Sequence, residues 1–212
     1  MSVTLAVDAM GGDHGIVVTV PASTGLLAEL PDLHIRLVGN ADLINQALSQ
    51  VPSEIKSRIT VVHASEVVTM DDSIEVALRK KKDSSMRVAA EQVKEGLAQA
   101  AISAGNTGAL MAGGTLRLRT MSGITRPALA AVVPRQGGHF VLIDAGANPE
   151  ATSEHLVHNA MLGSHYCRVM LGIERPRVGL MTIGTEEGKG TPLITETNDL
   201  LRRLSDVINY AG

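Results

Sequence analysis

Val3-Thr-Leu-Ala-Val7 is a short apolar run that passes directly into the glycine-rich segment Asp8-Ala-Met-Gly-Gly-Asp-His-Gly15. A stretch with helical spacing and many small residues follows, as far as Glu29. The order of strand, glycine-bearing loop and helix is typical of α/β proteins, in which ligands bind beyond the carboxyl ends of the strands. We therefore expect the chain to begin with a strand of a parallel sheet, followed by a candidate binding loop.

The same order recurs along the rest of the chain. We expect further strands at 35–38, 59–62, 100–103, 128–133, 140–143 and 177–183, and helices at 41–48, 86–97, 109–118, 153–173 and from Thr191-Pro192 onward. The strands are nearly continuous apolar runs, which indicates a sheet covered on both faces. The sequence thus predicts a single α/β unit over residues 1–212, with a doubly wound, mostly parallel sheet and helices on both faces.

The composition excludes several classes of function. With 44% hydrophobic residues in 212, the chain is not of the disordered class. A net charge of −3 and 1% aromatic residues provide neither a basic surface nor stacking platforms for nucleic acid. A single cysteine forms neither an internal disulfide nor a cysteine-based zinc site, which favours the cytoplasm. We expect no signal peptide and no membrane span.

Four glycine-rich segments follow expected strands: Met10–His14, Ser103–Gly108, Asp144–Asn148 and Gly184–Gly190. Glycine allows backbone N–H groups to approach an anion closely, and the N-terminus of a following helix adds positive potential. One such loop is ordinary turn chemistry, whereas four at equivalent places indicate a cleft that binds an anion.

Familiar catalytic motifs are absent or incomplete. Gly184-Thr-Glu-Glu-Gly-Lys-Gly190 is one residue shorter than a phosphate-binding P-loop, and Gly190 occupies the place of its Ser or Thr. Lys189 is therefore interpreted either as a cation presented on a flexible loop at a strand end or, if the loop is taken alone, as a solvated surface lysine. The sequence contains neither G-x-S-x-G nor G-x-G-x-x-G, which argues against a nucleophile elbow and against ordinary dinucleotide binding.

Three other features have a plain structural interpretation. His155 and His158 have helical spacing but lack H-E-x-x-H and cysteine partners, so a polar helix face is favoured over a metal site. Cys167 falls on an apolar helix stripe, which predicts a buried structural thiol. The basic run Arg79-Lys-Lys-Lys82 is either solvated surface or a docking patch for an acidic partner, and composition does not decide between them.

Taken together, the segments at 6–14, 77–86, 103–112, 126–129, 144–148 and 176–190 closely resemble the PlsX family of phosphate acyltransferases, in that family's order and over essentially the whole chain. The resemblance implies an isocitrate/isopropylmalate-dehydrogenase-like fold and transfer of a long-chain acyl group from acyl carrier protein to inorganic phosphate. The product, acyl phosphate, serves phospholipid synthesis. The resemblance also implies a cytoplasmic homodimer, peripheral contact with the bacterial membrane, hand-off to a glycerol-3-phosphate acyltransferase, and no cofactor or metal.

The chemistry expected of such an enzyme assigns roles to particular residues. Phosphate is already a nucleophile and a thioester is an activated donor, so the protein needs to position them and stabilise charge. We expect Lys189 to balance the phosphate or oxyanion charge, His14 to protonate the departing thiol and Asn106 to position phosphate. Substrate-binding roles are expected for Asp8, Gly11, Gly12, Asp13, Ser84, Ser85, Ser103, Gly105, Thr107, Gly108, Asp144 and Asn148. Arg79, Lys80, Lys81 and Lys82 would dock acyl carrier protein, which is acidic.

The chain also departs from the family pattern. Ile16 and Ile74 stand where the family often has proline, and the family continues well beyond Gly212. We therefore expect residues 1–212 to correspond to the N-terminal portion of a longer enzyme. Two alternatives stay open: a phosphotransacetylase-like enzyme that uses coenzyme A thioesters, and a non-catalytic fragment that binds phosphate or carrier protein.

Overall fold

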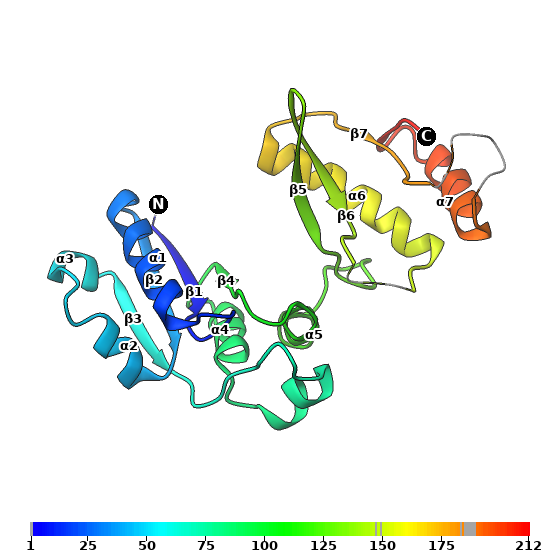
Figure 1. Cartoon of the computed structure of the whole chain (residues 1–212). Coiled ribbons are helices and arrows are strands. Elements are labelled where there is room, and N and C mark those ends of the chain that lie inside the picture. The colour runs from blue at the N-terminus through cyan, green and yellow to red at the C-terminus, as the bar shows by residue number, and fades with distance from the viewer. Residues whose placement is uncertain (1, 147, 149, 183, 185–189) are drawn as a thin grey trace. The chain divides into compact units, whose positions relative to one another are not determined.

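The computed structural model describes residues 2–146, 148, 150–182, 184 and 190–212 (Figure 1). The chain divides into two compact units, Met1–Arg119 and Thr120–Gly212, and each is described by itself. Whether residues 1–212 form the single α/β unit expected from the sequence stays a prediction.

The first unit contains a four-stranded, wholly parallel sheet. Its strands are β1 (Val3–Asp8), β2 (Leu33–Gly39), β3 (Ile59–His63) and β4 (Ala100–Ile102), in the order β3-β2-β1-β4. The helices are α1 (Ile16–Glu29), α2 (Ala41–Ala47), α3 (Ser53–Lys56), the π-helix η1 (Val76–Lys80), α4 (Ser85–Lys94) and α5 (Thr107–Leu118). The parallel order and the four strands expected in this part of the chain are confirmed.

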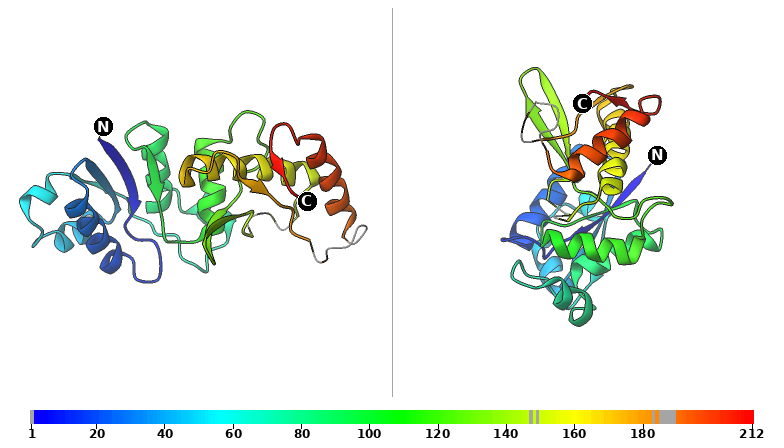
Figure 2. Two further views of the ribbon diagram at one scale, coloured as in Figure 1. Left: turned by 90° about the horizontal axis from the view of Figure 1, so that it is seen from above. Right: turned by 90° about the vertical axis from the view of Figure 1, so that its right-hand side faces the viewer.

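Helices cover both faces of this sheet (Figure 2). Successive side chains of a strand point to opposite faces, so neighbouring residues of β2 enter different parts of the core. Leu37 packs in a cluster with Leu27 of α1 and Ile44 of α2, whereas Val38 packs in a second cluster with Ala89 of α4. The doubly wound arrangement predicted from the apolar strands is therefore present in this unit.

The second unit is built around a hairpin and two helices. Its elements are β5 (Ala130–Arg135), β6 (Gly138–Ile143), α6 (Ser153–Leu171), β7 (Arg177–Val178), α7 (Pro192–Arg203) and β8 (Asn209–Tyr210). β5 and β6 pair antiparallel, and β7 pairs parallel with β8. Ala160 of α6, Leu201 of α7 and Ile208 form the buried core of this unit. The expected strand at 177–183 is therefore much shorter than its apolar sequence suggested.

The starts of α6 and α7 show two different ways to begin a helix. Thr152 and His155 form a reciprocal capping box on α6: the Thr152 hydroxyl accepts from the His155 amide at 3.3 Å, and His155 Nδ1 accepts from the Thr152 amide at 3.2 Å. α7 begins at Pro192 as predicted, but the Thr191 side chain makes no capping hydrogen bond. Proline at the first helical position, without a hydroxyl cap, therefore marks this start.

Replacing Leu37 by Ala tests the core of the first unit. Leu37 is fully buried in β2, so its loss should lower the free energy of unfolding by about 2–5 kcal/mol. The same change at Leu43 of α2, which is 46% exposed, should cost less than about 0.5 kcal/mol. Urea unfolding measures both variants, and equal losses would contradict the packing described for this sheet.

Candidate active site

The carboxyl edge of the parallel sheet brings together two of the predicted glycine-rich loops. β1 and β4 are adjacent and parallel, so the segments that follow them leave the sheet side by side. The Ser103 hydroxyl after β4 donates to Asp8 Oδ2 at the end of β1, at 2.7 Å. Asp8 is only 2% exposed. One buried hydrogen bond thus joins segments that are 95 residues apart in the sequence.

Asp8 also organises the loop that follows its own strand. Its Oδ1 accepts from the amides of Met10 at 3.2 Å and Gly11 at 3.1 Å. A Cβ atom at position 11 would lie 2.6 Å from Asp8 Oδ2, so only glycine allows this close approach. The geometry gives Asp8 and Gly11 a role in shaping the loop, whereas their contact with substrate stays a prediction.

The second loop leads into the N-terminus of α5. Ser103 Oγ accepts from the amide of Gly105 at 3.1 Å, and the Asn106 side chain accepts from the Ala109 amide at 3.0 Å as the helix N-cap. Among the described residues, no group accepts a hydrogen bond from the amides of Thr107 or Gly108. Two free N–H groups at the positive end of a helix dipole are suited to bind an anion.

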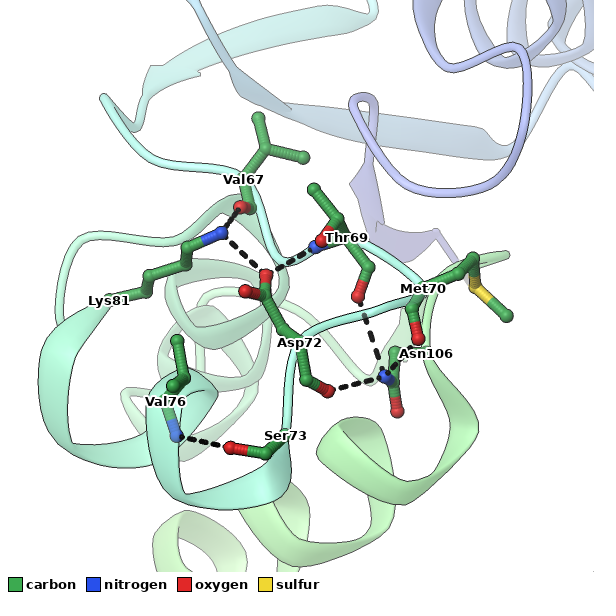
Figure 3. A network of polar contacts seen from close by, with 8 residues as sticks. All are labelled: Val67, Thr69, Met70, Asp72, Ser73, Val76, Lys81 and Asn106. Carbon is green, nitrogen blue, oxygen red and sulfur yellow. Dashed lines mark hydrogen bonds and ion pairs between the residues drawn. The ribbon is translucent and has the colours of Figure 1, made fainter.

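Asn106 does more than cap the helix. Figure 3 shows its amide nitrogen facing the carbonyl groups of a distant loop, with Nδ2 at 3.4 Å from Thr69 O, 3.2 Å from Met70 O and 3.1 Å from Asp72 O. Both ends of this side chain are therefore engaged by the protein. Sequence analysis placed Asn106 in contact with phosphate, and that role stays a prediction; the geometry makes it a residue that positions the loop and the helix start.

The same loop is held from its other side by an ion pair. Lys81 Nζ lies 2.5 Å from Asp72 Oδ2 and donates to Val67 O at 2.7 Å (Figure 3). Asp72 Oδ2 also accepts from the Thr69 amide at 2.7 Å. These bonds hold the pKa of Asp72 below its ordinary value. The bond from Lys81 has the largest effect, and the bond from the Thr69 amide has the next largest. Sequence reasoning missed Thr69 and Asp72, because no local motif marks them and their partner Asn106 lies 37 and 34 residues further along the chain.

The predicted docking run therefore separates into inward and outward residues. Lys81 has a side chain only 25% exposed and bonded within the unit. Arg79 is exposed and pairs with Glu75 at 3.0 Å. Lys80 and Lys82 are also exposed. A carrier protein could reach these three cations far more readily than Lys81.

The remaining predicted residues of the first unit differ in exposure. Ser84 and Ser85, at the start of α4, are each 1% exposed, and Ser85 Oγ is buried without a partner among the described residues. Asp13 and His14 are exposed in the loop after β1. The His14 side chain makes no hydrogen bond with the part of the chain that the structure describes, so it is free to meet a substrate.

Asp144 and Asn148 lie together in the second unit. Asp144 Oδ1 accepts from the Leu129 amide at 3.0 Å, and Asp144 Oδ2 accepts from Asn148 Nδ2 at 2.6 Å. Asn148 Nδ2 also donates to Pro127 O at 3.1 Å. Asp144 and Asn148 thus bind each other and the segment at 127–129. Lys189 and most of the fourth loop lie outside the described residues.

The histidines of α6 were expected on a polar helix face and Cys167 as a buried thiol, and the structure departs from both expectations in part. His155 belongs to the helix cap, and His158 Nδ1 is buried without a partner among the described residues. The described residues contain no group of three or more His, Cys, Asp or Glu arranged to hold a metal. Cys167 is half-buried, and burial raises the pKa of its thiol above the ordinary value. A raised pKa lowers the thiolate population that a nucleophile needs.

Comparison with known proteins gives consistent results. The model of the family described as "Fatty acid synthesis protein" matches residues 3–212. A phosphate acyltransferase of Polynucleobacter necessarius is 51% identical over the whole chain, and one of Alcanivorax borkumensis is 51% identical over 99% of it. The chain spans only 63% and 62% of the lengths of these two relatives.

A solved structure gives independent support for the fold. The phosphotransacetylase EutD of Staphylococcus aureus matches the whole chain and 68% of its own, with a TM-score of 0.69 at 15% sequence identity. A 4-hydroxythreonine-4-phosphate dehydrogenase of Burkholderia phymatum matches with a TM-score of 0.52 at 16% identity. These likenesses confirm the predicted α/β fold class with a mostly parallel sheet.

Replacing Asn106 by Ser should separate its two roles: the clamp, meaning the hydrogen bonds from its amide nitrogen to the loop at 69–72, and the helix cap made by its side-chain oxygen. Serine caps helices as well as asparagine does but lacks the amide that donates to the loop at 69–72. We expect N106S to lower the free energy of unfolding by about 1–3 kcal/mol, because the part-buried carbonyl group of Asp72 loses its donor. Asn40, which caps α2 through Asp42 and Leu43 alone, provides the control: N40S should change stability by less than about 0.5 kcal/mol. Equal effects in urea unfolding would refute the clamp.

Asp72→Asn should destabilise the protein in a pH-dependent way. Because the folded pKa of Asp72 is lowered, its carboxylate contributes stability above the unfolded pKa of about 3.9 and loses that contribution as pH falls through the folded value. The stability difference between wild type and D72N should thus be largest near neutral pH and shrink as the pH falls below about 4. Urea midpoints measured across this range test it. Asp71→Asn, at the exposed neighbour, should show no such trend.

Proposed function

The chain belongs to the fatty acid synthesis protein family, and from this membership we propose that it takes part in transfer of an acyl group to inorganic phosphate. The observation that carries the proposal is 51% identity, over essentially the whole chain, to relatives named phosphate acyltransferase. The structure supports it with a helix N-terminus whose first two amides are free, placed at the carboxyl edge of a parallel sheet.

The proposed reaction is a direct acyl transfer. A phosphate oxygen attacks the carbonyl carbon of an acyl thioester, the new C–O bond forms, the C–S bond breaks, and the departing sulfur takes up a proton. The amides of Thr107 and Gly108 would hold phosphate at the N-terminus of α5. The exposed imidazole of His14 would supply the proton, and Lys189 would balance negative charge as the sequence analysis proposed.

No covalent enzyme intermediate is required. Cys167 is the only cysteine of the chain, and burial raises the pKa of its thiol. A protonated, half-buried thiol is a poor nucleophile compared with phosphate, which is already ionised at neutral pH. This supports attack by phosphate itself rather than passage through an acyl-cysteine.

The acyl donor is proposed to be a long-chain thioester of acyl carrier protein. The exposed cations Arg79, Lys80 and Lys82 would contact this acidic protein, while Lys81 serves the loop inside the unit. A homodimer, peripheral contact with the membrane and hand-off to a glycerol-3-phosphate acyltransferase remain part of the proposal. Among the described residues, no helix is both long and apolar enough to cross a bilayer.

A phosphotransacetylase-like activity is the second candidate. The fold likeness to EutD favours it, because that protein's name describes acyl transfer involving phosphate. The two candidates differ in the thiol that carries the acyl group, coenzyme A or the carrier protein. A comparison of both thioesters as donors separates them. A fragment that binds phosphate without turnover is the third possibility, and the same assay with phosphate titration identifies it.

Thiol release from acyl carrier protein thioester should depend on added phosphate. The assay follows free thiol with and without phosphate, using residues 1–212 and a version extended to the length of the relatives. Release that proceeds equally without phosphate would refute the proposed transfer. Faster release from the coenzyme A thioester would favour the second candidate.

Thr107→Pro tests the proposed contribution of one group, the amide N–H of residue 107. Proline is tolerated at the first position of a helix, and Asn106 already has the extended ψ of 111° that precedes proline well. The change removes one amide proposed to bind phosphate, so the KM for phosphate should rise about tenfold with the fold intact. Ser153→Pro, at the first position of α6, is the matched control and should leave that KM unchanged.

A further inference from the structure

An apolar groove lies between η1, α4 and α5 within the first unit. It leaves about 450 Å³ of empty space, including its open mouth. The side chains that line it are mainly aliphatic and include Val68, Ala77, Leu78, Met86, Leu110 and Leu116. Thr107 and Gly108, proposed to hold phosphate, do not line this groove, whereas Ser84, one of the predicted substrate-binding residues, does.

Two adjacent glycines in the middle of α5 keep the groove open. Gly113 and Gly114 both line it. A Cβ atom at Gly113 would come only within 3.9 Å of Leu78 Cδ2, and one at Gly114 would meet nothing within 4 Å. Glycine weakens a helix relative to alanine, and here the packing of the chain does not require it. Among the described residues, no side chain fills this space.

One end of the groove reaches the loop at the candidate active site. Met86 lines the groove, and its methyl group lies 3.0 Å from where a Cβ of Gly105 would be. Ala109 also lines the groove and donates its amide to the Asn106 cap. An apolar chain attached to a group bound at the amides of Thr107 and Gly108 could therefore extend directly into the groove.

The charged residues of the groove wall disfavour a cationic chain end. Arg87 Nε lies 3.1 Å and Arg117 Nε 3.4 Å from the same oxygen of Glu91, and all three side chains are between 22% and 31% exposed. Two guanidinium groups on one carboxylate leave one positive charge uncompensated. Arg117 lies ten residues beyond Thr107 on α5, about 15 Å from the amides proposed to bind the head. This charge therefore disfavours a cationic chain end, and the anionic head is inferred from those amides alone.

We propose that the groove between η1, α4 and α5 binds the hydrocarbon chain of an acyl phosphate, with its phosphate head at the N-terminus of α5. This proposal rests on the proposed function and extends it. Because Gly114 lines the groove, it would be a determinant of acyl chain length. The thioester donor would place its acyl chain in the same groove before the transfer.

The test uses non-reactive alkyl phosphates as probes in calorimetric titrations of residues 1–212. Dodecyl phosphate, kept below its critical micelle concentration, should bind wild type more tightly than butyl phosphate does. Gly114→Leu fills the groove and should weaken dodecyl phosphate binding about tenfold or more, with little effect on butyl phosphate. Gly25→Leu is the matched control, because Gly25 lies within α1 and a Cβ there also meets nothing within 4 Å. It should leave both affinities unchanged.

The fold of both variants can be verified independently. Leucine is a better helix former than glycine, so both changes should raise the thermal midpoint by about 2–4 °C. A second pair of variants does not depend on filling the groove. Leu116→Glu places a carboxylate at the edge of the groove, where residue 116 is 65% exposed, and should also weaken the binding of dodecyl phosphate. Leu118→Glu, at a position 45% exposed and outside the groove lining, should not.

Two results would overturn the proposal: an affinity of wild type that does not rise with chain length, or dodecyl phosphate affinities that are equal in G114L and G25L. Either result leaves phosphate-dependent thiol release untouched, so the groove can fail while the proposed function stands. If alkyl phosphates behave as expected but thiol release does not depend on phosphate, the groove stands and the proposed function fails.

Discussion

The hydrogen bond from the Ser103 hydroxyl to the Asp8 carboxylate is the interaction on which the candidate site depends. It joins the ends of β1 and β4, two strands that pair directly in the parallel sheet. Because Asp8 also accepts from the amides of Met10 and Gly11, one buried carboxylate fixes the first loop and ties it to the second. The loop that begins at Ser103 leads into α5, whose first two amides have no partner among the described residues.

A second set of contacts keeps that helix start in place. Asn106 caps α5 with its oxygen and holds the carbonyl groups of Met70 and Asp72 with its nitrogen. The ion pair between Asp72 and Lys81 secures the same loop from the opposite side. Polar side chains that resemble catalytic groups in the sequence thus hold the loops in place, and the first two amides of α5 are left without a partner among the described residues. Such a division suits a reaction whose nucleophile and leaving group both come from the substrates.

The first unit also combines two environments that an acyl phosphate would need. The N-terminus of α5 offers hydrogen-bond donors and positive potential, while the groove beside it is lined by aliphatic side chains. Gly113 and Gly114 lie on the groove side of the same helix that presents the free amides. A single twelve-residue helix would therefore contact both the head and the chain of the ligand.

The sequence alone determined the parallel sheet of the first unit and the glycine-rich loops, because apolar strand patterns and turn residues act over short distances. It determined the family through the resemblance of its motifs. It did not distinguish Lys81 from Lys80 and Lys82, which are identical in local context, and it made Asn106 a phosphate ligand without its contacts at 69–72. It also expected too long a strand after Arg177. Only the tertiary structure decided these points, since a side chain's role depends on partners brought close by folding: Val67 and Asp72 for Lys81, and three distant carbonyl groups for Asn106.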